Sequence, residues 1–511
     1  MNKRYALLSV YDKTGIVEFA KTLDKLGFKI ISTGGTGKVL VNEGIPVVPI
    51  EEITGNPESF DGRMKTISFQ VESGILFDRT NPTHRRVARQ LGIKPIDIVA
   101  CNLYPFEATK TVENIDVGGP TMIRAAAKNF KNVLVVVDPK DYQSVGKELL
   151  GKKLTQKTRR ALAGKAFRHL SLYDSLVARF LDKEQFPQEL TIPLRGGIKL
   201  RYGENPHQEG FVYFEPGTNS PFRNLQRLGG RELSLVNVTD INAGLESLRL
   251  LGEGPAAVII KHNSPCGIAL GRTSKEALGR AIESDPESAF GGVIVLNKGM
   301  DLATAKVIAA FKSERKSNID IVAVPSITQD ALELLKKVRK SMGIYTFGQI
   351  PKKRTNPINI KWIDGGLILQ TEDSYDTPEI AKEWKVVTRA KPTPQQFRQM
   401  KFAWDALRRI RSNAVIVVDK ELPMVWGIGQ GQTSRYRSTM IALSQAGKHV
   451  KGAILASDSF FPYEDSVKSA TKRGIGAIIE QGGSINDQAS IDAANKAGIP
   501  MVFTNFRAFW H

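Results

Sequence analysis

The chain has 511 residues, of which 41% are hydrophobic, and it carries a formal net charge of +20. This length predicts two or three domains with full cores, and no apolar run approaches the roughly 18 residues of a membrane span. The only cysteines, Cys101 and Cys266, have no C-x-x-C spacing, which argues against structural zinc and favours a reducing cytosol.

The N-terminal part alternates strands and helices. We expect strands over 4–10, 28–31 and 45–48 and a helix over 15–26, a β-α-β-α-β pattern that predicts a parallel sheet. The start of the chain has too short an apolar core for a signal peptide, so we expect a cytoplasmic protein.

A glycine-rich turn, Ser32–Lys38, separates the second strand from the next helix. Free backbone N–H groups at the start of a helix form a natural phosphate cradle. The turn is not a Walker A loop, because Ser32 stands where the first glycine belongs and Val39 replaces the Ser/Thr.

Further candidate groups follow in the same part of the chain. The segment 61–66 predicts a loop with two cations and a hydroxyl, and a strand over 96–101 leads to Tyr104. Asp116 then precedes a helix that carries Lys128, and Gly118-Gly119 leaves backbone donors open to an anion. Taken singly, these residues also fit a helix cap and solvent-facing lysines.

A basic helical region over 143–185 is followed by a stretch rich in proline and glycine. This break predicts a domain boundary at about 185–200. We therefore divide the chain into domains 1–190 and 191–511.

The most informative stretch is Lys261–Gly267, directly after the apolar run Ala256–Ile260. Ligands bind at the carboxyl ends of strands in open α/β sheets, and His262 can exchange protons near neutral pH while Lys261 stabilises negative charge. We expect a Pro-Cys-Gly turn to follow. A bare Lys-His pair also fits a surface lysine beside a capping histidine.

Polar or glycine-rich strings surround this stretch, at 200–208, 284–292, 411–414, 427–435, 457–462 and 505–511. The run Gly427–Gly431 lacks G-x-G-x-x-G spacing, so a dinucleotide-binding loop is excluded. Because terminal residues usually fray, a functional His511 requires a tail that is tied down.

Together the strings LRYGENPHQ, KHNSPCG, DPESAFGG, SNA and GQTSR resemble the AICAR transformylase/IMP cyclohydrolase family of purine biosynthesis, over essentially the whole chain. The resemblance implies an α/β fold with an N-terminal methylglyoxal-synthase-like parallel-sheet domain and a C-terminal domain of two cytidine-deaminase-like subdomains. True deaminases hold zinc with a cysteine pair, whereas Cys266 has no second cysteine nearby, so we expect no catalytic metal.

The resemblance implies formyl transfer from the co-substrate 10-formyltetrahydrofolate to AICAR, giving FAICAR. It implies His262 as the proton acceptor, Lys261 as its electrostatic partner and proton donor, and Asn413 as the group that orients the formyl oxygen. It also implies a homodimer, because the family's transformylase site lies between subunits. The matching nucleotide- and folate-site positions are Arg201, Tyr202, Arg435, Phe460, Arg507 and His511.

The second implied reaction closes the ring of FAICAR to IMP with loss of water. Nucleophile and electrophile share one molecule, so positioning supplies much of the rate. The family's catalytic positions match Lys65, Tyr104, Asp116 and Lys128. The positions that hold the ribose phosphate and base match Ser9, Lys13, Ser32, Thr33, Gly34, Gly35, Arg63 and Thr66.

The chain departs from the family pattern at several positions. Ser264 replaces an asparagine, Tyr11 stands where a small residue is common, and 67–73 lacks the family's two histidines. The last two changes adjoin the cyclohydrolase pocket, so an enzyme with transformylase activity alone stays open as an alternative.

The charge of +20 leaves open a third reading, an RNA-binding protein on an enzyme scaffold. The basic clusters 336–340 and 351–354 carry no interleaved aromatics and no nucleic-acid motif. We therefore expect a solvated surface that steers anionic small-molecule substrates, with neither nucleic acid nor membrane as a partner.

Overall fold

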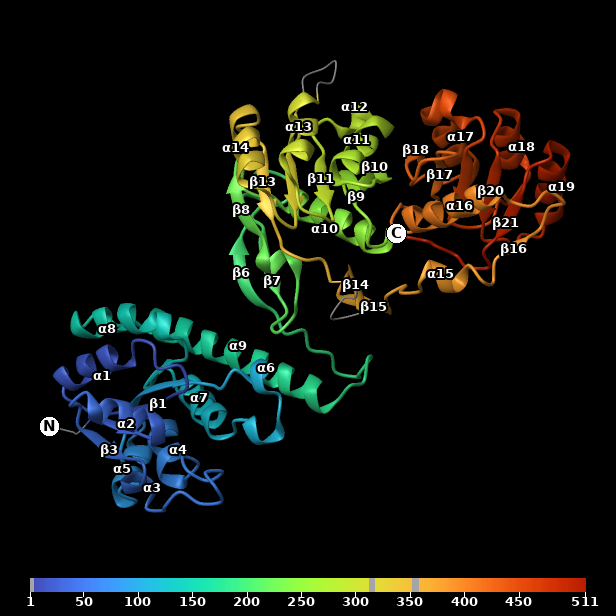
Figure 1. Ribbon diagram of the computed structural model, residues 1–511. Coiled ribbons are helices and arrows are strands. Elements are labelled where there is room, and N and C mark those ends of the chain that lie inside the picture. Colours follow the sequence, from blue (N-terminus) through green and yellow to red (C-terminus); the bar gives the residue numbers. More distant parts are fainter. Residues whose placement is uncertain (1–3, 312–317, 352–357) are drawn as a thin grey trace. The chain divides into compact units, whose positions relative to one another are not determined.

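The computed structural model describes residues 4–311, 318–351 and 358–511, so Lys352, Lys353 and Arg354 of the second basic cluster lie outside it. It has two compact units (Figure 1). The first runs to Arg195 and includes Phe214–Gly217, and the second takes Gly196–Tyr213 and the chain from Thr218 onward. Within the described residues, no helix combines the length and apolar character needed to cross a bilayer.

The first unit is built on a five-stranded sheet of order β3-β2-β1-β4-β5, in which every pairing is parallel. Its strands are β1 (Arg4–Val10), β2 (Phe28–Ser32), β3 (Val47–Pro49), β4 (Ile96–Asn102) and β5 (Leu134–Val136). The parallel sheet predicted from the sequence is confirmed. The strand order reverses between β1 and β4, and such a switch point opens a crevice at the carboxyl ends of the strands.

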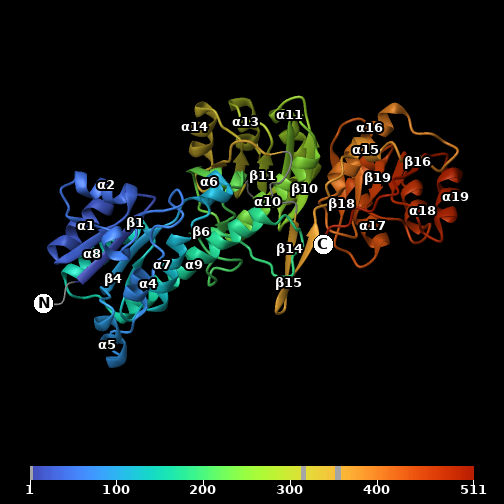
Figure 2. The ribbon, with the colours of Figure 1, turned by 90° about the horizontal axis from the view of Figure 1, so that it is seen from below.

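Helices cover both faces of this sheet. The principal ones are α1 (Ile16–Lys25), α2 (Gly34–Asn42), α4 (Phe69–Leu76), α7 (Gly118–Lys128), α8 (Tyr142–Leu150) and α9 (Gln156–Leu181). Shorter ones are α3 (Glu51–Thr54), α5 (Pro82–Gln90) and α6 (Phe106–Thr109). The helical region expected over 143–185 forms two helices, and α9 is the long one in Figures 1 and 2.

The second unit contains two six-stranded sheets with the same core topology. The first has the order β10-β9-β11-β12-β13-β8, and the second has the order β16-β21-β20-β19-β17-β18. In each, an antiparallel hairpin (β9–β10 or β17–β18) joins a third strand antiparallel (β11 or β19), and two parallel strands follow. The unit is therefore two repeats of one fold, as the expected pair of similar subdomains requires.

The strands of the first repeat are β8 (Gln226–Gly229), β9 (Ala256–Lys261), β10 (Ser264–Leu270), β11 (Val293–Leu296), β12 (Ile321–Val324) and β13 (Gly343–Thr346). Its helices are α10 (Leu235–Leu250), α11 (Ser274–Ser284), α12 (Pro286–Ala289), α13 (Leu302–Ala310) and α14 (Gln329–Val338). The basic cluster 336–340 begins in the last turn of α14.

The strands of the second repeat are β16 (Lys385–Val386), β17 (Val415–Val418), β18 (Val425–Gly429), β19 (Ile454–Ser457), β20 (Ala477–Glu480) and β21 (Met501–Phe503). Its helices are α15 (Thr377–Ile380), α16 (Pro394–Leu407), α17 (Arg435–Ala446), α18 (Asp465–Lys472) and α19 (Asp487–Ala497). There are two further two-stranded sheets, β6 (Arg195–Lys199) with β7 (Phe211–Phe214), most of whose residues belong to this unit, and the antiparallel pair β14 (Ile358–Ile363) with β15 (Gly366–Thr371).

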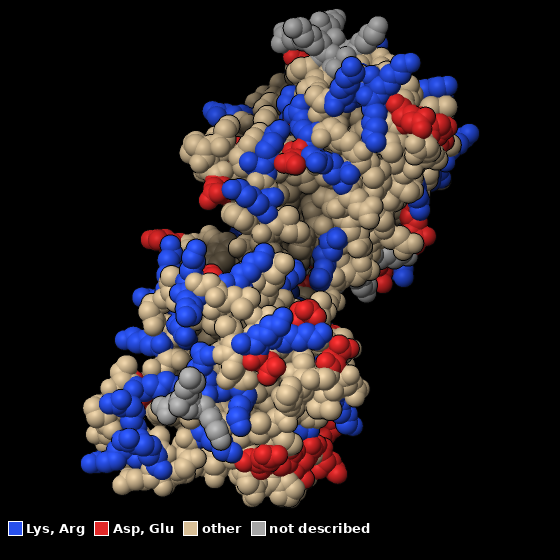
Figure 3. Space-filling model, turned by 90° about the vertical axis from the view of Figure 1, so that its left-hand side faces the viewer, with Lys and Arg blue, Asp and Glu red and all other residues tan. Residues whose placement is uncertain are grey.

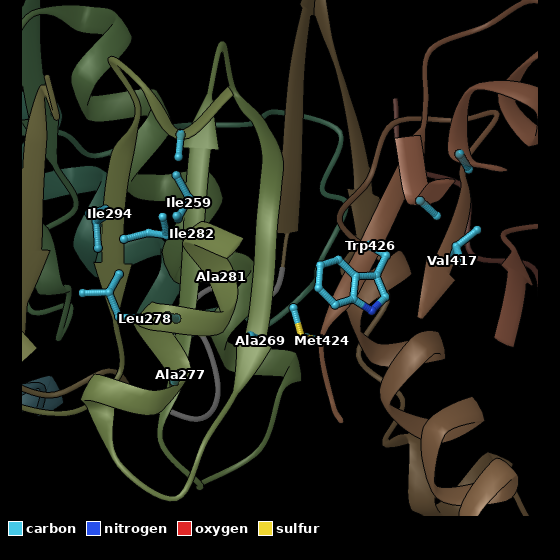
Figure 4. Packing of buried hydrophobic residues seen from close by; sticks show 14 of the residues in the cluster. Ile259, Ala269, Ala277, Leu278, Ala281, Ile282, Ile294, Val417, Met424 and Trp426 are labelled. Atoms are coloured by element: carbon cyan, nitrogen blue, oxygen red, sulfur yellow. The ribbon is translucent and has the colours of Figure 1, made fainter. Parts of the chain in front are cut away.

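The two repeats meet edge to edge and share their cores. Ala269 of β10 pairs antiparallel with Met424 beside β18, and the Leu270 N–H donates to the Pro423 carbonyl at 2.8 Å. Figure 4 shows Ala269 next to Met424, with Trp426 close by. Two continuous apolar clusters each draw residues from both repeats. Because the edge strands run in opposite directions, the start of β10 lies beside the end of β18.

Candidate functional sites

The first candidate site lies where β1, β2 and β4 end. Ser9 and Thr33 bring the ends of β1 and β2 together through a hydroxyl–hydroxyl bond of 3.1 Å. The Asn102 side chain at the end of β4 accepts the backbone N–H groups of Tyr11 (2.7 Å) and Asp12 (2.9 Å). Asn102 thereby fixes the loop after β1, a role that the sequence did not reveal because the partners lie about 90 residues apart.

Two lysines flank the glycine-rich turn at the start of α2. A Cβ on Gly34 would lie 2.9 Å from Lys65 Nζ, and one on Gly35 would lie 3.8 Å from Lys13 Cε. Ser32 is buried and donates to the Leu8 carbonyl at 2.7 Å, so its hydroxyl belongs to the sheet. Helix-start N–H groups between two ammonium groups suit a phosphate.

The start of α7 adds a carboxyl and a hydroxyl beside this turn. A Cβ on Gly118 would lie 2.5 Å from Thr66 Oγ1, and Asp116 accepts the Gly119 N–H at 2.8 Å. Burial raises the pKa of the Asp116 carboxyl, and the bond from Gly119 opposes that rise.

Three predicted residues of this site, Lys65, Arg63 and Tyr104, have side-chain partners or neighbours. Lys65 pairs with Glu58, and Arg63 forms an exposed ion pair with Glu113 at 2.6 Å. The half-exposed Tyr104 ring packs against the ring of Tyr11, with centroids 4.9 Å apart. Tyr11, noted above as a departure from the family, therefore lies directly against a predicted catalytic side chain.

A groove of about 750 Å³ runs along α7 between α4 and α9. Asp116 and Lys128 both line it, but from opposite ends of α7, which at 11 residues is about 15 Å long. The structure thus brings most predicted residues of this unit to the strand ends and places Lys128 at the far end of the groove. Its other charged lining residues are Glu72, Arg124 and Asp174.

The second candidate site begins at the β9–β10 hairpin, where one expectation is wrong. His262 and Asn263 have φ values of 55° and 59°, and Lys261 pairs with Ser264 across them. Two central residues with positive φ make the tight turn typical of two-residue hairpins. The turn is therefore His262-Asn263, and Pro265–Gly267 belongs to β10.

Gly267 is required for packing. A Cβ there would lie 2.1 Å from the Ala281 carbonyl of α11, so only glycine lets the helix approach the strand so closely. The equivalent Gly427 of β18 has the same relation to the Ala442 carbonyl of α17, at 2.0 Å. A glycine that serves helix packing looks in sequence like one that serves a turn.

The hairpin tip presents the proposed catalytic pair. Lys261 donates to the Phe290 carbonyl at 2.9 Å, and His262 is exposed at the turn. The next residue, Asn263, donates its N–H to the Asp240 carboxylate of α10 at 2.6 Å. Burial raises the pKa of Asp240, and the Asn263 N–H and the His262 charge oppose the rise. Asp240 therefore anchors the turn without occupying the imidazole.

In the second repeat, Asn413 is held from both ends of its amide. It accepts from Arg435 Nη2 at 2.8 Å and donates to the Gln432 carbonyl at 2.8 Å. Arg435, predicted to bind substrate, is 6% exposed and pairs with the fully buried Asp458. Asp458 also accepts the Ala414 N–H at 3.0 Å, and it is a site residue that we missed. The sequence could have indicated Asp458, because this carboxylate directly follows an apolar strand, where functional groups of α/β sheets lie.

The C-terminal segment is hydrogen-bonded to the loops that carry Asn413 and Asp458. The Ala508 N–H donates to the Asp458 carbonyl and the Ser412 N–H to the Trp510 carbonyl, both at 2.9 Å. Arg507 lies over the Phe509 ring at 4.6 Å, and that ring meets His511 edge-on with centroids 5.5 Å apart. The tail is thus held as a functional His511 requires. Phe460 is half-buried just after Asp458.

Further contacts connect these groups. Arg201 donates to the Tyr202 hydroxyl at 2.7 Å, and the Tyr202 carbonyl accepts the first N–H of α10, that of Leu235, at 3.1 Å. With its amide oxygen turned toward Arg411, Asn263 accepts from Arg411 Nη2 at 3.3 Å and donates to the Thr239 carbonyl. Arg411 lies two residues before Asn413, so this contact links the hairpin tip to the second repeat.

A second groove, of about 550 Å³, confirms that the start of β10 and the end of β18 share one edge. Its lining includes Pro265 and Cys266 from β10 and Ile428 and Gln430 from β18 and its end. Among the residues that the structure describes, no group of three or more His, Cys, Asp or Glu side chains could hold a metal ion.

Known proteins show the same combination of parts. A family model described as "AICARFT/IMPCHase bienzyme" matches residues 126–445, and one described as "MGS-like domain" matches 15–131. A protein of Persephonella marina named "Bifunctional purine biosynthesis protein PurH" is 42% identical over 99% of this chain and all of its own length. A protein of the same name from Thermoanaerobacter sp. is 43% identical over 99% of both chains.

A solved structure titled "Crystal structure of ForH" aligns with 35% of the chain and all of its own, at 37% identity and a TM-score of 0.33. The full-length relatives and the matched family model agree with each other. The chain therefore belongs to the AICARFT/IMPCHase bienzyme family.

Proposed function

We propose that the chain catalyses both reactions of its family, with one site in each unit. The second unit transfers the formyl group of 10-formyltetrahydrofolate to AICAR, and the first closes FAICAR to IMP. The observation that carries the proposal is the match to bifunctional relatives over the full length of both proteins.

In the transformylase step the AICAR amine attacks the formyl carbon, so a base must take the amine proton. His262 is exposed at the hairpin tip and suits this role, and the neighbouring Lys261 ammonium stabilises negative charge and supplies a proton to the leaving folate nitrogen. Asn413 orients the formyl oxygen, and Arg435 fixes the Asn413 amide with a bond of 2.8 Å. The remaining binding residues proposed here are Arg201, Tyr202, Phe460, Arg507 and His511.

In the cyclohydrolase step the glycine-rich turn holds the ribose phosphate between Lys13 and Lys65. Asp116 takes a proton from the attacking carboxamide, and the Lys65 ammonium and the Tyr104 hydroxyl stabilise the developing oxyanion. Lys128 is the fourth proposed catalytic residue, and its side chain lines the far end of the α7 groove. Ser9, Ser32, Thr33, Gly34, Gly35, Arg63 and Thr66 complete the proposed binding set.

The proposal includes a cytoplasmic homodimer that acts on small anionic substrates and needs no catalytic metal, with the domain boundary near residue 190. Lys and Arg side chains are spread over the face in Figure 3, which supports steering of phosphorylated and carboxylated substrates. The folate is a co-substrate, consumed in each turnover.

The test supplies AICAR and 10-formyltetrahydrofolate to the purified chain and identifies the product. IMP is the expected result, whereas FAICAR that accumulates without IMP would leave the transformylase alone. Lys261→Ala and His262→Ala should each lower formyl transfer at least about a hundredfold, the usual scale for a lost acid or base, and leave cyclisation of added FAICAR unchanged. Parallel loss of both activities would contradict the assignment of one site to each unit.

A further inference from the structure

Glu72, one turn into α4, has no assigned role, although it lines the same groove as Asp116 and Lys128. It lies in the segment 67–73 that lacks the family's two histidines. Ser68 caps the helix by accepting the Val71 N–H at 3.1 Å, so the altered sequence forms a well-capped helix. That helix delivers a carboxyl to the groove.

One oxygen of this carboxyl is left without a partner. Within the described residues, Glu72 Oε1 is inaccessible to solvent and accepts no hydrogen bond. Burying a carboxylate oxygen without a donor disfavours the anion, and burial raises the pKa of Glu72 to about 7. A carboxyl with this pKa exchanges protons near neutral pH.

The other titratable and charged groups that line the groove come from α9, α7 and the residue just before α7. Asp174 of α9 is paired with Arg124 at 3.2 Å, and in the part of the chain that the structure describes Lys128 and Glu72 do not form an ion pair with each other. Asp116 accepts the Gly119 N–H, which supports its anion. The lining groups are Asp116, Arg124 and Lys128 with Tyr173 and Asp174.

We propose that Glu72 is the proton donor for the loss of water in the cyclohydrolase reaction, with Asp116 as the base. This inference rests on the proposed function of the first unit. Two carboxyls in one groove whose environments differ take the opposite roles of acid and base. Here the carboxyl with no donor is the acid, and the one with a backbone donor is the base.

The proton balance closes within the reaction. The carboxamide nitrogen of FAICAR bonds to the formyl carbon and gives up a proton, and the formyl oxygen becomes a hydroxyl. The C–O bond then breaks, and the hydroxyl leaves as water with the proton of Glu72. The formamido nitrogen, now part of the new ring, forms a double bond to this carbon and releases its proton, which reprotonates the Glu72 carboxylate.

The test is Glu72→Gln in the full chain, assayed with FAICAR alone across pH. The variant keeps the shape of the side chain but cannot exchange a proton, so kcat should fall about a hundredfold while KM changes less than about threefold. Wild-type kcat should decline as pH rises through about 7, because the protonated acid is lost, and the variant should lack that decline. Asp174→Asn, which removes a carboxyl from the same groove, is the matched control and should leave both parameters unchanged.

An independent readout is the infrared difference spectrum of wild type minus variant, which should show the band of one protonated carboxyl at pH 6 and a weaker band at pH 8, because the other protonated carboxyls, such as Glu480, cancel. A Glu72→Gln enzyme with kcat within about twofold of wild type, or with the same pH profile, would overturn the inference. A wild-type chain that makes no IMP from FAICAR would instead overturn the proposed function itself.

Discussion

The two repeats of the second unit satisfy the same backbone need with different side chains. Leu296 pairs with Ala257 as Ser457 pairs with Val415, so the residues that follow, Asn297 and Asp458, are equivalent. Asn297 accepts the Ala256 N–H at 2.8 Å, and Asp458 accepts that of Ala414 at 3.0 Å. Asp458 has a second, charged oxygen that also binds Arg435. Asp458 thus keeps the structural role that Asn297 has in the first repeat and adds a negative charge that holds Arg435.

The hairpins of the two repeats differ in the same way. By strand register Lys261 corresponds to Asp419. Both carboxylate oxygens of Asp419 accept hydrogen bonds from its own hairpin. Asp419 accepts the N–H groups of Glu421 at 2.8 Å and Leu422 at 2.7 Å, and its other oxygen accepts Trp426 Nε1 at 2.8 Å. Lys261 instead precedes a two-residue turn with an exposed histidine. One hairpin is closed by hydrogen bonds to Asp419, and the other presents an exposed histidine at its tip.

The largest effect on stability should come from replacing Asp458 by asparagine, the residue that the first repeat has at the equivalent position. Asp458→Asn keeps an acceptor for the Ala414 N–H but leaves the Arg435 guanidinium buried without its anion. Removing one partner of a buried pair costs about 3–5 kcal/mol, to be measured as the free energy of unfolding in urea. The reciprocal Asn297→Asp gives up one bond, the 2.8 Å donation to the Gly254 carbonyl, and should cost about 1 kcal/mol. Equal costs for the two exchanges would show that the charge has no special role.

An intermediate effect should come from the equivalent glycines. Gly267→Ala and Gly427→Ala each drive a methyl group into a helix carbonyl and should destabilise the chain by similar amounts, about 1–3 kcal/mol. Gly279→Ala, within α11 and with nothing within 4 Å of the added methyl, should stabilise it by about 0.5–1 kcal/mol. A large difference between the first two variants would break the equivalence of the repeats.

The smallest effect concerns a buried carboxyl that only the second repeat has. Glu480 ends β20 where Val324 ends β12, and burial raises the pKa of Glu480 to about 8. Its carboxyl is therefore protonated more readily in the folded than in the unfolded chain, so stability is full below about pH 4.5 and falls as pH rises through 8.

Glu480→Gln should consequently stabilise the chain more at pH 6 than at pH 5, by about 1 kcal/mol, since each pH unit between the unfolded and folded pKa contributes about that much. Thermal unfolding at the two pH values measures the difference. A gain that is independent of pH would rule out ionisation of Glu480 as its cause.

Local patterns were enough to predict the first unit's parallel sheet and the apolar strand Ala256–Ile260. They also placed Lys261 and His262 at the end of a strand, where the structure has them. The Pro-Cys-Gly turn was wrong because turn residues and packing glycines have the same composition, and only the position of α11 distinguishes them.

Contacts between distant segments could not be predicted. Asn102 binds a loop about 90 residues away, and Asp458 meets Arg435 and Ala414 only after two strands and a helix have packed. The pair of similar subdomains was implied by the family resemblance and not by local patterns, because the repeats share a strand order and a register. These contacts depend on which strands pair with each other, and the sequence of a single segment does not determine that pairing.

The junction between β10 and β18 has a consequence for dissecting the protein. Each of these strands is the outer strand of its sheet, and each uses the other repeat as its neighbour. A fragment that carries one repeat alone would expose a bare hairpin edge next to half of a shared apolar cluster, and such edges recruit other chains. The repeats are therefore separable in topology but not in solution, and fragments should be cut between the two compact units.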